Sequence, residues 1–160
     1  PIHIVAETGS ELIMRNLLLT GCKINQRTAN QNTALHIAAQ NRHPILCSIL
    51  TEHGINVGAR NTDGDCALHI ALKNSDHDVV SILIATGSDP CALDANSHNA
   101  LHLLALHGGD NSVVIFDLLH NWNLGKLELD VEDQEGNTAL LLAYMNNNAG
   151  LCRSLVKAGA

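Results

Sequence analysis

Large aromatic residues are nearly absent from this sequence, which has one Phe, one Trp and one Tyr among 160 residues. Apolar residues still make up 46% of the chain, so Leu, Ile, Val and Ala must fill its core. Such a core suits thin, closely packed helices stacked as repeats. The length is sufficient for one domain with a sizeable buried interior.

Basic residues are also scarce, with 9 Lys and Arg against 16 Asp and Glu and a net charge of −7. Nucleic acids and anionic membrane surfaces both attract basic patches, so the charge argues against either as a partner. No apolar run reaches the 18 residues that would indicate a membrane span. We therefore expect no nucleic acid binding and no direct membrane contact by this chain.

Motifs for catalysis, cofactors and metals are missing. The sequence has no P-loop, no G-x-G-x-x-G, no G-x-S-x-G and no H-E-x-x-H. Its cysteines are odd in number, widely spaced and without a C-x-x-C pair, which predicts buried thiols in a reducing, cytoplasmic compartment. They stand at positions 22, 47, 66, 91 and 152. We expect no enzymatic activity, no cofactor and no metal site.

A short phrase repeats along the chain and is best preserved as Asn-Thr-Ala-Leu-His-Ile-Ala-Ala at residues 32–39. Its histidine recurs at positions 3, 36, 69 and 102, a constant spacing of 33 residues, and a fifth copy has Leu141 instead. A fixed period of this length indicates a repeat architecture.

Each repeat follows the same order of signals. A turn such as Thr62–Asp65 precedes an N-cap residue and a short apolar run, and a polar break separates this run from a second one. The second run ends on Gly at positions 21, 54, 87 and 159, as expected for a left-handed helix C-terminus. Helices this short are stable only when packed on neighbours.

These features resemble the ankyrin repeat, with its Thr-Pro-Leu-His-x-Ala phrase and Gly-Ala helix end. The resemblance implies an all-α solenoid of helix-turn-helix units joined by short β-hairpin turns. We predict one domain over 1–160, with a fourth repeat six residues longer than the others. Neither end has the polar outer face of a capping repeat, which predicts a segment of a longer array. The expected repeats are about 1–29, 30–62, 63–95, 96–134 and 135–160.

Parts of the last two repeats, among them 101–103, 115–118 and 138–153, resemble the C-terminal array of the rabankyrin family of ankyrin-repeat and FYVE-domain proteins of early endosomes. That resemblance implies an adaptor or effector in endocytic membrane trafficking, on the cytosolic face of early endosomes. It implies a protein partner, either a Rab-type small GTPase or another trafficking factor. The alternatives are a structural spacer in a long array and an ankyrin scaffold from an unrelated pathway.

The repeated histidines could suggest a metal site, but each is a full repeat from the next. Packed helices lie about 8–10 Å apart, whereas zinc ligands lie about 2.0–2.3 Å from the metal. We therefore predict that each imidazole uses both ring nitrogens to join its own repeat to the next.

We predict that turn tips and first helices form the binding surface, weighted to repeats 3–5. Leu93, Leu106 and Met145 occupy places where a solvated face should be polar, which indicates either a contact site or packing on one another or on further repeats. The candidate protein-binding residues are Arg60, Asp63, Asp65, Lys73, Leu93, Asn96, His98, Leu106, His107, Trp122, Met145 and Asn146.

Two features of the lengthened fourth repeat have open interpretations. Trp122 is expected past the second helix, either closing the longer loop or exposed as a binding anchor. In residues 128–135, Leu129 and Val131 alternate with carboxylates, which predicts an extended, half-buried strand. This strand is either a solvated β-finger or an acidic contact for a basic partner.

Overall fold

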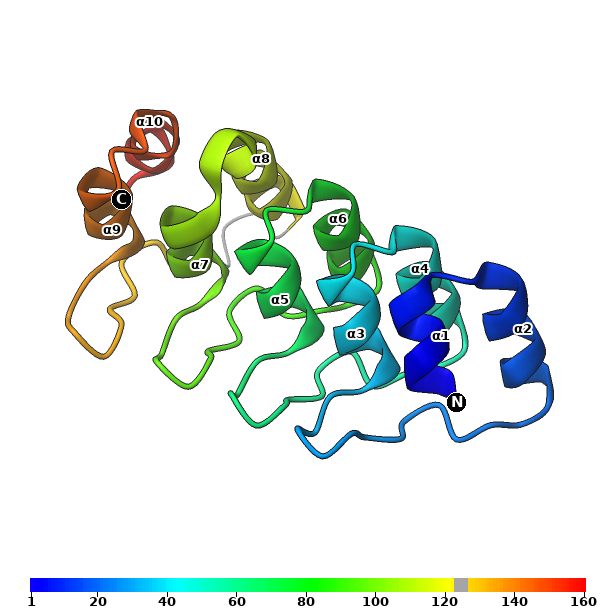
Figure 1. Ribbon diagram of the computed structural model, residues 1–160. Coiled ribbons are helices and arrows are strands. Elements are labelled where there is room, and N and C mark those ends of the chain that lie inside the picture. Colours follow the sequence, from blue (N-terminus) through cyan, green and yellow to red (C-terminus); the bar gives the residue numbers. More distant parts are fainter. Residues whose placement is uncertain (123–126) are drawn as a thin grey trace.

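A computed structural model describes residues 1–122 and 127–160 of the chain (Figure 1). Helices account for its regular structure, which confirms the predicted all-α ankyrin solenoid. The helices are α1 (Ile2–Thr8), α2 (Glu11–Leu19), α3 (Ala34–Gln40), α4 (Pro44–Glu52), α5 (Ala67–Lys73), α6 (His77–Ala85), α7 (Ala100–His107), α8 (Ser112–Trp122), α9 (Ala139–Met145) and α10 (Ala149–Ala158), with a 3₁₀ turn η1 (Gly109–Asn111).

The helices form two parallel rows. The first helices of the repeats, α1, α3, α5, α7 and α9, contact one another in that order. The second helices, α2, α4, α6, α8 and α10, form the other row, and each repeat pairs one helix from each row. The turns that enter the first helices extend to one side of the stack (Figure 1). We call the surface formed by the first helices and these turns the inner face.

The predicted helix signals are confirmed. Thr33, Cys66, Asn99 and Thr138 are the N-caps of α3, α5, α7 and α9, with extended backbone before the helix. Gly21, Gly54, Gly87 and Gly159 follow the second helices with φ between 75° and 106°. Because side chains larger than hydrogen disfavour this conformation, glycine ends each second helix sharply.

Aliphatic side chains fill the space between the rows. Leu35, Leu68 and Leu101 occupy the same place in three successive first helices, and each is 1% exposed or less. Ala38 and Ala71 are completely buried, and their small size allows the first helices to approach closely. The rarity of aromatic residues thus agrees with the observed packing.

The fourth repeat is lengthened at two places. Residues Gly109–Asn111 form the 3₁₀ turn η1, and α8 has 11 residues where α6 has 9. Trp122 is the last residue of α8, so its expected position beyond the second helix was wrong. Its side chain lies outside the described residues, as do residues 123–126.

The strand predicted for residues 128–135 was also wrong. Leu129 and Val131 are half-buried between exposed neighbours, as the alternation indicated. The described part of this segment has no regular ladder, and only one isolated bridge joins Glu132 to Thr138. Alternation reports which side chains are covered, but a strand also needs a neighbouring chain to pair with. Among the described residues, no helix is both long and apolar enough to cross a membrane.

Candidate protein-interaction surface

Four turns with the same backbone geometry form the edge of the inner face (Figure 1). In each, the first N–H donates to the carbonyl four residues later at 2.9 Å, and the fourth residue has a positive φ. Asn and Asp side chains at the first position accept further backbone N–H groups, which rigidifies the turn. The turns are Thr28–Asn32, Asn61–Asp65, Asp94–His98 and Asp133–Asn137.

The histidines act as joints between repeats, as predicted. Nδ1 of His36 accepts the Thr33 backbone N–H at 3.1 Å, so its Nε2 carries the proton and donates to the Asp65 carbonyl at 3.0 Å. His102 makes the equivalent bond from Nε2 to the Asn137 carbonyl at 3.1 Å, and His69 Nε2 donates at 2.9 Å to the carbonyl of Ala92, just before the next turn. Burial lowers the pKa of His36 and of His102, which keeps both rings neutral.

Arginine side chains form a second link between turns. Arg27 Nη1 donates to the Arg60 carbonyl at 2.7 Å, and Arg60 Nη1 donates to the carbonyls of Gly64 and Leu93. Arg60, predicted as a partner contact, is therefore engaged in holding two turns together. Arg27 and Arg60 are separated by 33 residues, so the repeat period carried the signal for this ladder.

A third link joins side chains at the base of consecutive turns. At the junction of repeats 2 and 3, Asn61 Nδ2 donates to Asn32 Oδ1 at 3.0 Å. At the next junction the equivalent residues are Asp65 and Asp94, two carboxylates that would repel one another. Lys73 lies between them, with Nζ 2.7 Å from Asp65 Oδ1 and 3.9 Å from Asp94 Oδ2.

At the junction of repeats 4 and 5 the same position is taken by an imidazole and a carboxylate. His98 Nδ1 lies 3.2 Å from Asp94 Oδ2, and His98 Nε2 lies 3.6 Å from Asp133 Oδ2. The side chains of Asp94 and Asp133 are only 2% and 3% exposed. Burial alone would raise the pKa of both carboxyls, but backbone N–H donors in their turns and the His98 ring lower it below the usual range.

Three predicted contact residues therefore belong to one polar network. Asp65, Lys73 and His98 are brought together with Asp94 and Asp133, which the sequence interpretation missed. Their signal was the recurrence of Asn or Asp at the first position of the three later turns. Because Asp65 is buried and paired with Lys73, this network stabilises the turns internally and does not form an exposed contact surface.

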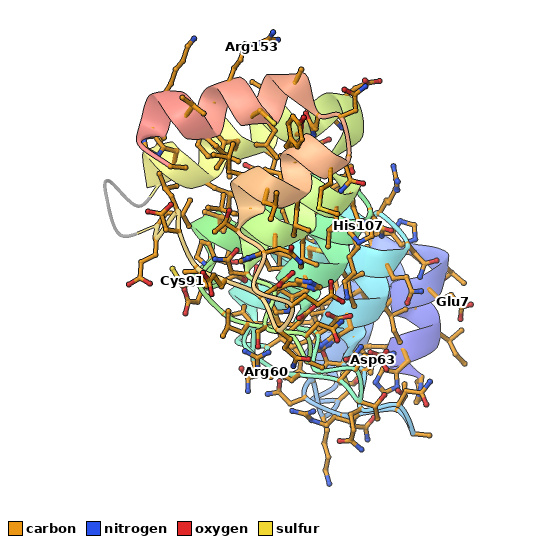
Figure 2. All side chains as sticks on the ribbon, turned by 90° about the vertical axis from the view of Figure 1, so that its left-hand side faces the viewer. Glu7, Arg60, Asp63, Cys91, His107 and Arg153 are labelled. Carbon is orange, nitrogen blue, oxygen red and sulfur yellow. The ribbon has the colours of Figure 1, made fainter. Side chains whose placement is uncertain are left out.

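Four other predicted residues lie at the turn tips. Arg60, Asp63, Leu93 and Asn96 are exposed, and Leu93 retains 42% of its accessible surface. Figure 2 shows Arg60 and Asp63 at the turn edge of the molecule, far from His107, which lies on the side of the loops between paired helices. The turn tips thus provide an accessible edge with both charged and apolar groups.

The remaining described candidates lie at the junction of repeats 4 and 5. Leu106, His107 and Asn146 line a cleft of about 610 Å³, in which burial lowers the pKa of His107. Met145 lines an adjacent cleft of about 560 Å³ with Tyr144 and Cys152. The apolar residues expected as one cluster are therefore divided between a turn tip and two clefts that share residues 147–149.

A polar groove of about 370 Å³ lies further toward the N-terminus, between repeats 2 and 3. Most of the side chains that line it are amides, and the others are Asp63, the Lys73–Asp65 pair and Ile70. Among the described residues, no group of three His, Cys, Asp or Glu side chains is arranged to hold a metal ion. The amides that line the groove belong to Asn30, Asn32, Gln40, Asn61 and Asn74.

The family model of ankyrin repeats, in three copies, matches residues 2–94. The chain belongs to the ankyrin-repeat family. It is 49% identical over 160 residues to Rabankyrin-5 of Mus musculus and 50% identical over 161 residues to Rabankyrin-5 of Homo sapiens. These alignments cover 99% and 100% of this chain, which spans only 14% of the length of either relative. Ankyrin repeats are protein-interaction modules.

Proposed function

We propose that this chain is a non-enzymatic protein-interaction module that acts as an adaptor in endocytic membrane trafficking, on the cytosolic face of early endosomes. The observation that carries the proposal is the similarity to Rabankyrin-5 along the full length of the chain, at 49% and 50% identity. The partner is a Rab-type small GTPase or another trafficking factor. The chain itself contacts neither nucleic acid nor membrane, in keeping with its net charge of −7.

The contact surface in this proposal is the inner face of repeats 3–5. Asp63, Leu93 and Asn96 would contribute from the turn tips, and Leu106 and Met145 from the helix ends. Met145 is 67% exposed, and Leu106 is half-buried in the neighbouring cleft. Apolar side chains exposed among polar ones are a common feature of protein interfaces.

The test is affinity measurement with the doubly substituted chain Leu106→Ala, Met145→Ala. Purified early-endosomal Rab-type GTPases, loaded with GTP or GDP, serve as the first probes, followed by quantitative capture from cytosol. We expect at least a tenfold loss of affinity, while Val114→Ala, at an exposed position on α8, leaves it unchanged. Equal binding by the double variant, with an unchanged circular dichroism spectrum, would contradict the assigned surface.

A second candidate function is a structural spacer within a longer array, and the joints between repeats support it. His36, His69 and His102 each link successive repeats by an Nε2 bond to a backbone carbonyl, and this recurrence suits a stiff rod. The same capture experiment separates the two functions. A wild-type chain that retains no protein at micromolar concentration favours the spacer, and a partner from another pathway favours an unrelated ankyrin scaffold.

We also propose that further repeats cover the outer surfaces of the first and last repeats. Tyr144 is 77% exposed, whereas its equivalents Ala39, Leu72 and Ala105 are at most 2% exposed under the following repeat. At the opposite end Leu12 is 71% exposed. In the full-length protein, Tyr144 should be iodinated at least tenfold more slowly than in the 160-residue chain. Equal rates would contradict this arrangement.

A further inference from the structure

We propose that the groove between repeats 2 and 3 binds an extended segment of a partner protein through the backbone amide groups of that segment. The proposal rests on the function proposed above and specifies its ligand. The groove runs between two turns, at residues 30–32 and 61–65, and the C-terminal ends of α3 and α5. Its volume is about 370 Å³.

Two of its side-chain amides are fixed by the fold. Asn61 donates to Asn32 Oδ1, and its own Oδ1 accepts the N–H groups of Asp63 and Asp65 at 3.0 Å. Asn74 Nδ2 donates to the Gln40 carbonyl at 3.2 Å. These bonds place the amide groups along the groove without a ligand, so binding would require little further ordering.

Other amide groups in the groove are available. Within residues 1–122 and 127–160, no hydrogen bond engages the side chains of Asn30 and Gln40, both of which are exposed. Asn32 Oδ1 accepts the bond from Asn61. Asn32 Nδ2 has no hydrogen-bond acceptor among the described residues. The groove thus presents donors and acceptors together.

A primary amide offers one donor group and one acceptor group, as the peptide unit does. Gln40 can therefore pair with both the N–H and the C=O of a partner backbone, whatever side chains the partner carries. A helical partner segment satisfies these groups internally, so it would gain little from the amides. An extended segment leaves them free.

Charge contributes little to this groove. Lys73 Nζ lies 2.7 Å from both carboxylate oxygens of Asp65, so these two charges balance one another. Asp63 is then the remaining charged residue in the lining. Ile70 is half-buried and offers an apolar contact to the peptide. The fitting ligand is therefore an extended, largely uncharged peptide.

The probe is a display library of random twelve-residue peptides selected on the 160-residue chain. For the best binder, N-methylation is introduced at successive backbone nitrogens and compared with an alanine scan of its side chains. We expect N-methylation at two or more positions to weaken binding roughly tenfold, which exceeds most alanine effects. Raising the salt concentration from 50 to 300 mM should change the affinity by less than about threefold.

Substitution of the chain locates the site. Gln40→Leu should weaken peptide binding roughly three- to tenfold, since it removes hydrogen bonds and preserves the shape of the side chain. Gln26→Leu, at an exposed position outside the groove lining, is the matched control and should have no effect. Neither side chain is buried, so both variants should fold.

The outcomes separate this inference from the proposed function. Binders that ignore both Gln40→Leu and N-methylation overturn the inference, and so does a selection that yields no binder. A protein partner captured equally by wild type and Gln40→Leu, but lost with the Leu106 and Met145 substitutions, also overturns it and leaves the proposed function standing. Loss of the partner in both variants supports both.

Discussion

The His98 ring lies between carboxylates of two successive turns, 3.2 Å from Asp94 and 3.6 Å from Asp133. The side chains of both carboxylates are almost completely buried, and that of His98 is 16% exposed. A neutral imidazole has one N–H, so it can donate to one of the two at a time, whereas an imidazolium can donate to both. This contact couples the turns of repeats 4 and 5 across the lengthened segment.

A double-mutant cycle should measure that coupling. We expect His98→Ala and Asp133→Asn, studied alone and together by urea unfolding, to show a coupling free energy of about 0.5–1 kcal/mol. Asp130→Asn, at an exposed position, is the control. Additive effects of the two substitutions would show that the two side chains do not interact.

Two glycines with similar backbones should respond differently to alanine. Gly64 and Gly136 both occupy the fourth position of a turn, with φ of 76° and 79°. A Cβ on Gly64 would lie 2.9 Å from the Ala95 backbone nitrogen, whereas one on Gly136 meets nothing within 4 Å.

We therefore expect Gly136→Ala to cost about 1 kcal/mol of unfolding free energy from backbone strain alone. Gly64→Ala should cost about 2–4 kcal/mol, because the clash with the next turn adds to the strain. Chemical denaturation of the two variants gives the comparison. Equal losses would mean that the turns of repeats 3 and 4 can separate without cost.

Stability should fall as the medium becomes mildly acidic. Burial lowers the pKa of His36 and of His102 below the ordinary histidine value of 6.5. The unfolded chain therefore takes up protons first, so this stabilisation is complete above about pH 6.5 and is lost as the pH falls below that value. Asp94 and Asp133, with lowered pKa, keep their contribution throughout this range.

His69 has the opposite sign. Burial alone would lower the pKa of His69, but the neighbouring Cys66 raises it overall. The stabilisation that His69 provides is therefore present at low pH and is lost as the pH rises through its raised pKa. We expect the contributions of His36 and His102 to exceed it and the melting temperature to fall between pH 7.5 and 5.5. The pH dependence should be smaller in His102→Asn and unchanged in His77→Asn, which alters a partly exposed ring. An identical slope in His102→Asn would contradict the assignment.

The cysteines should differ in reactivity. Cys47 is fully buried in α4, and burial raises the pKa of its thiol to about 12. Because the thiolate is the reactive form, iodoacetamide at pH 8 should leave Cys47 unmodified in the folded chain. Cys22 and Cys152 are half-buried and free and should react first. Peptide mass mapping gives the order, and early labelling of Cys47 would contradict its placement.

The repetitive part of this fold could be predicted from the sequence because its signals are local and recur. The spacing of His36, His69 and His102 indicated the solenoid, and the role of each ring followed from that spacing. The glycine at the end of each second helix was predicted for the same reason. These residues act within one repeat or at a fixed distance from the next, so the period carries the information.

The contacts that depend on tertiary packing could not be predicted in this way. Asp65 was predicted as an exposed contact, but its pairing with Lys73, eight residues later at the end of α5, appears only in the folded repeat. The pair His98 and Asp133 was hidden by the longer fourth repeat. The alternation around Leu129 correctly indicated burial, but it could not show that the segment has no regular partner strand among residues 1–122 and 127–160.

The bonds that histidine and arginine side chains make at the turn edge point in one direction. His36, His69 and His102 each donate to a backbone carbonyl in or just before the next turn along the chain, as do Arg27 and Arg60. On a ribosome, where the N-terminal part emerges first, each new turn would therefore meet donors that the preceding repeat has already positioned. The completed part of the molecule can in this way serve as a template for the part still being synthesised.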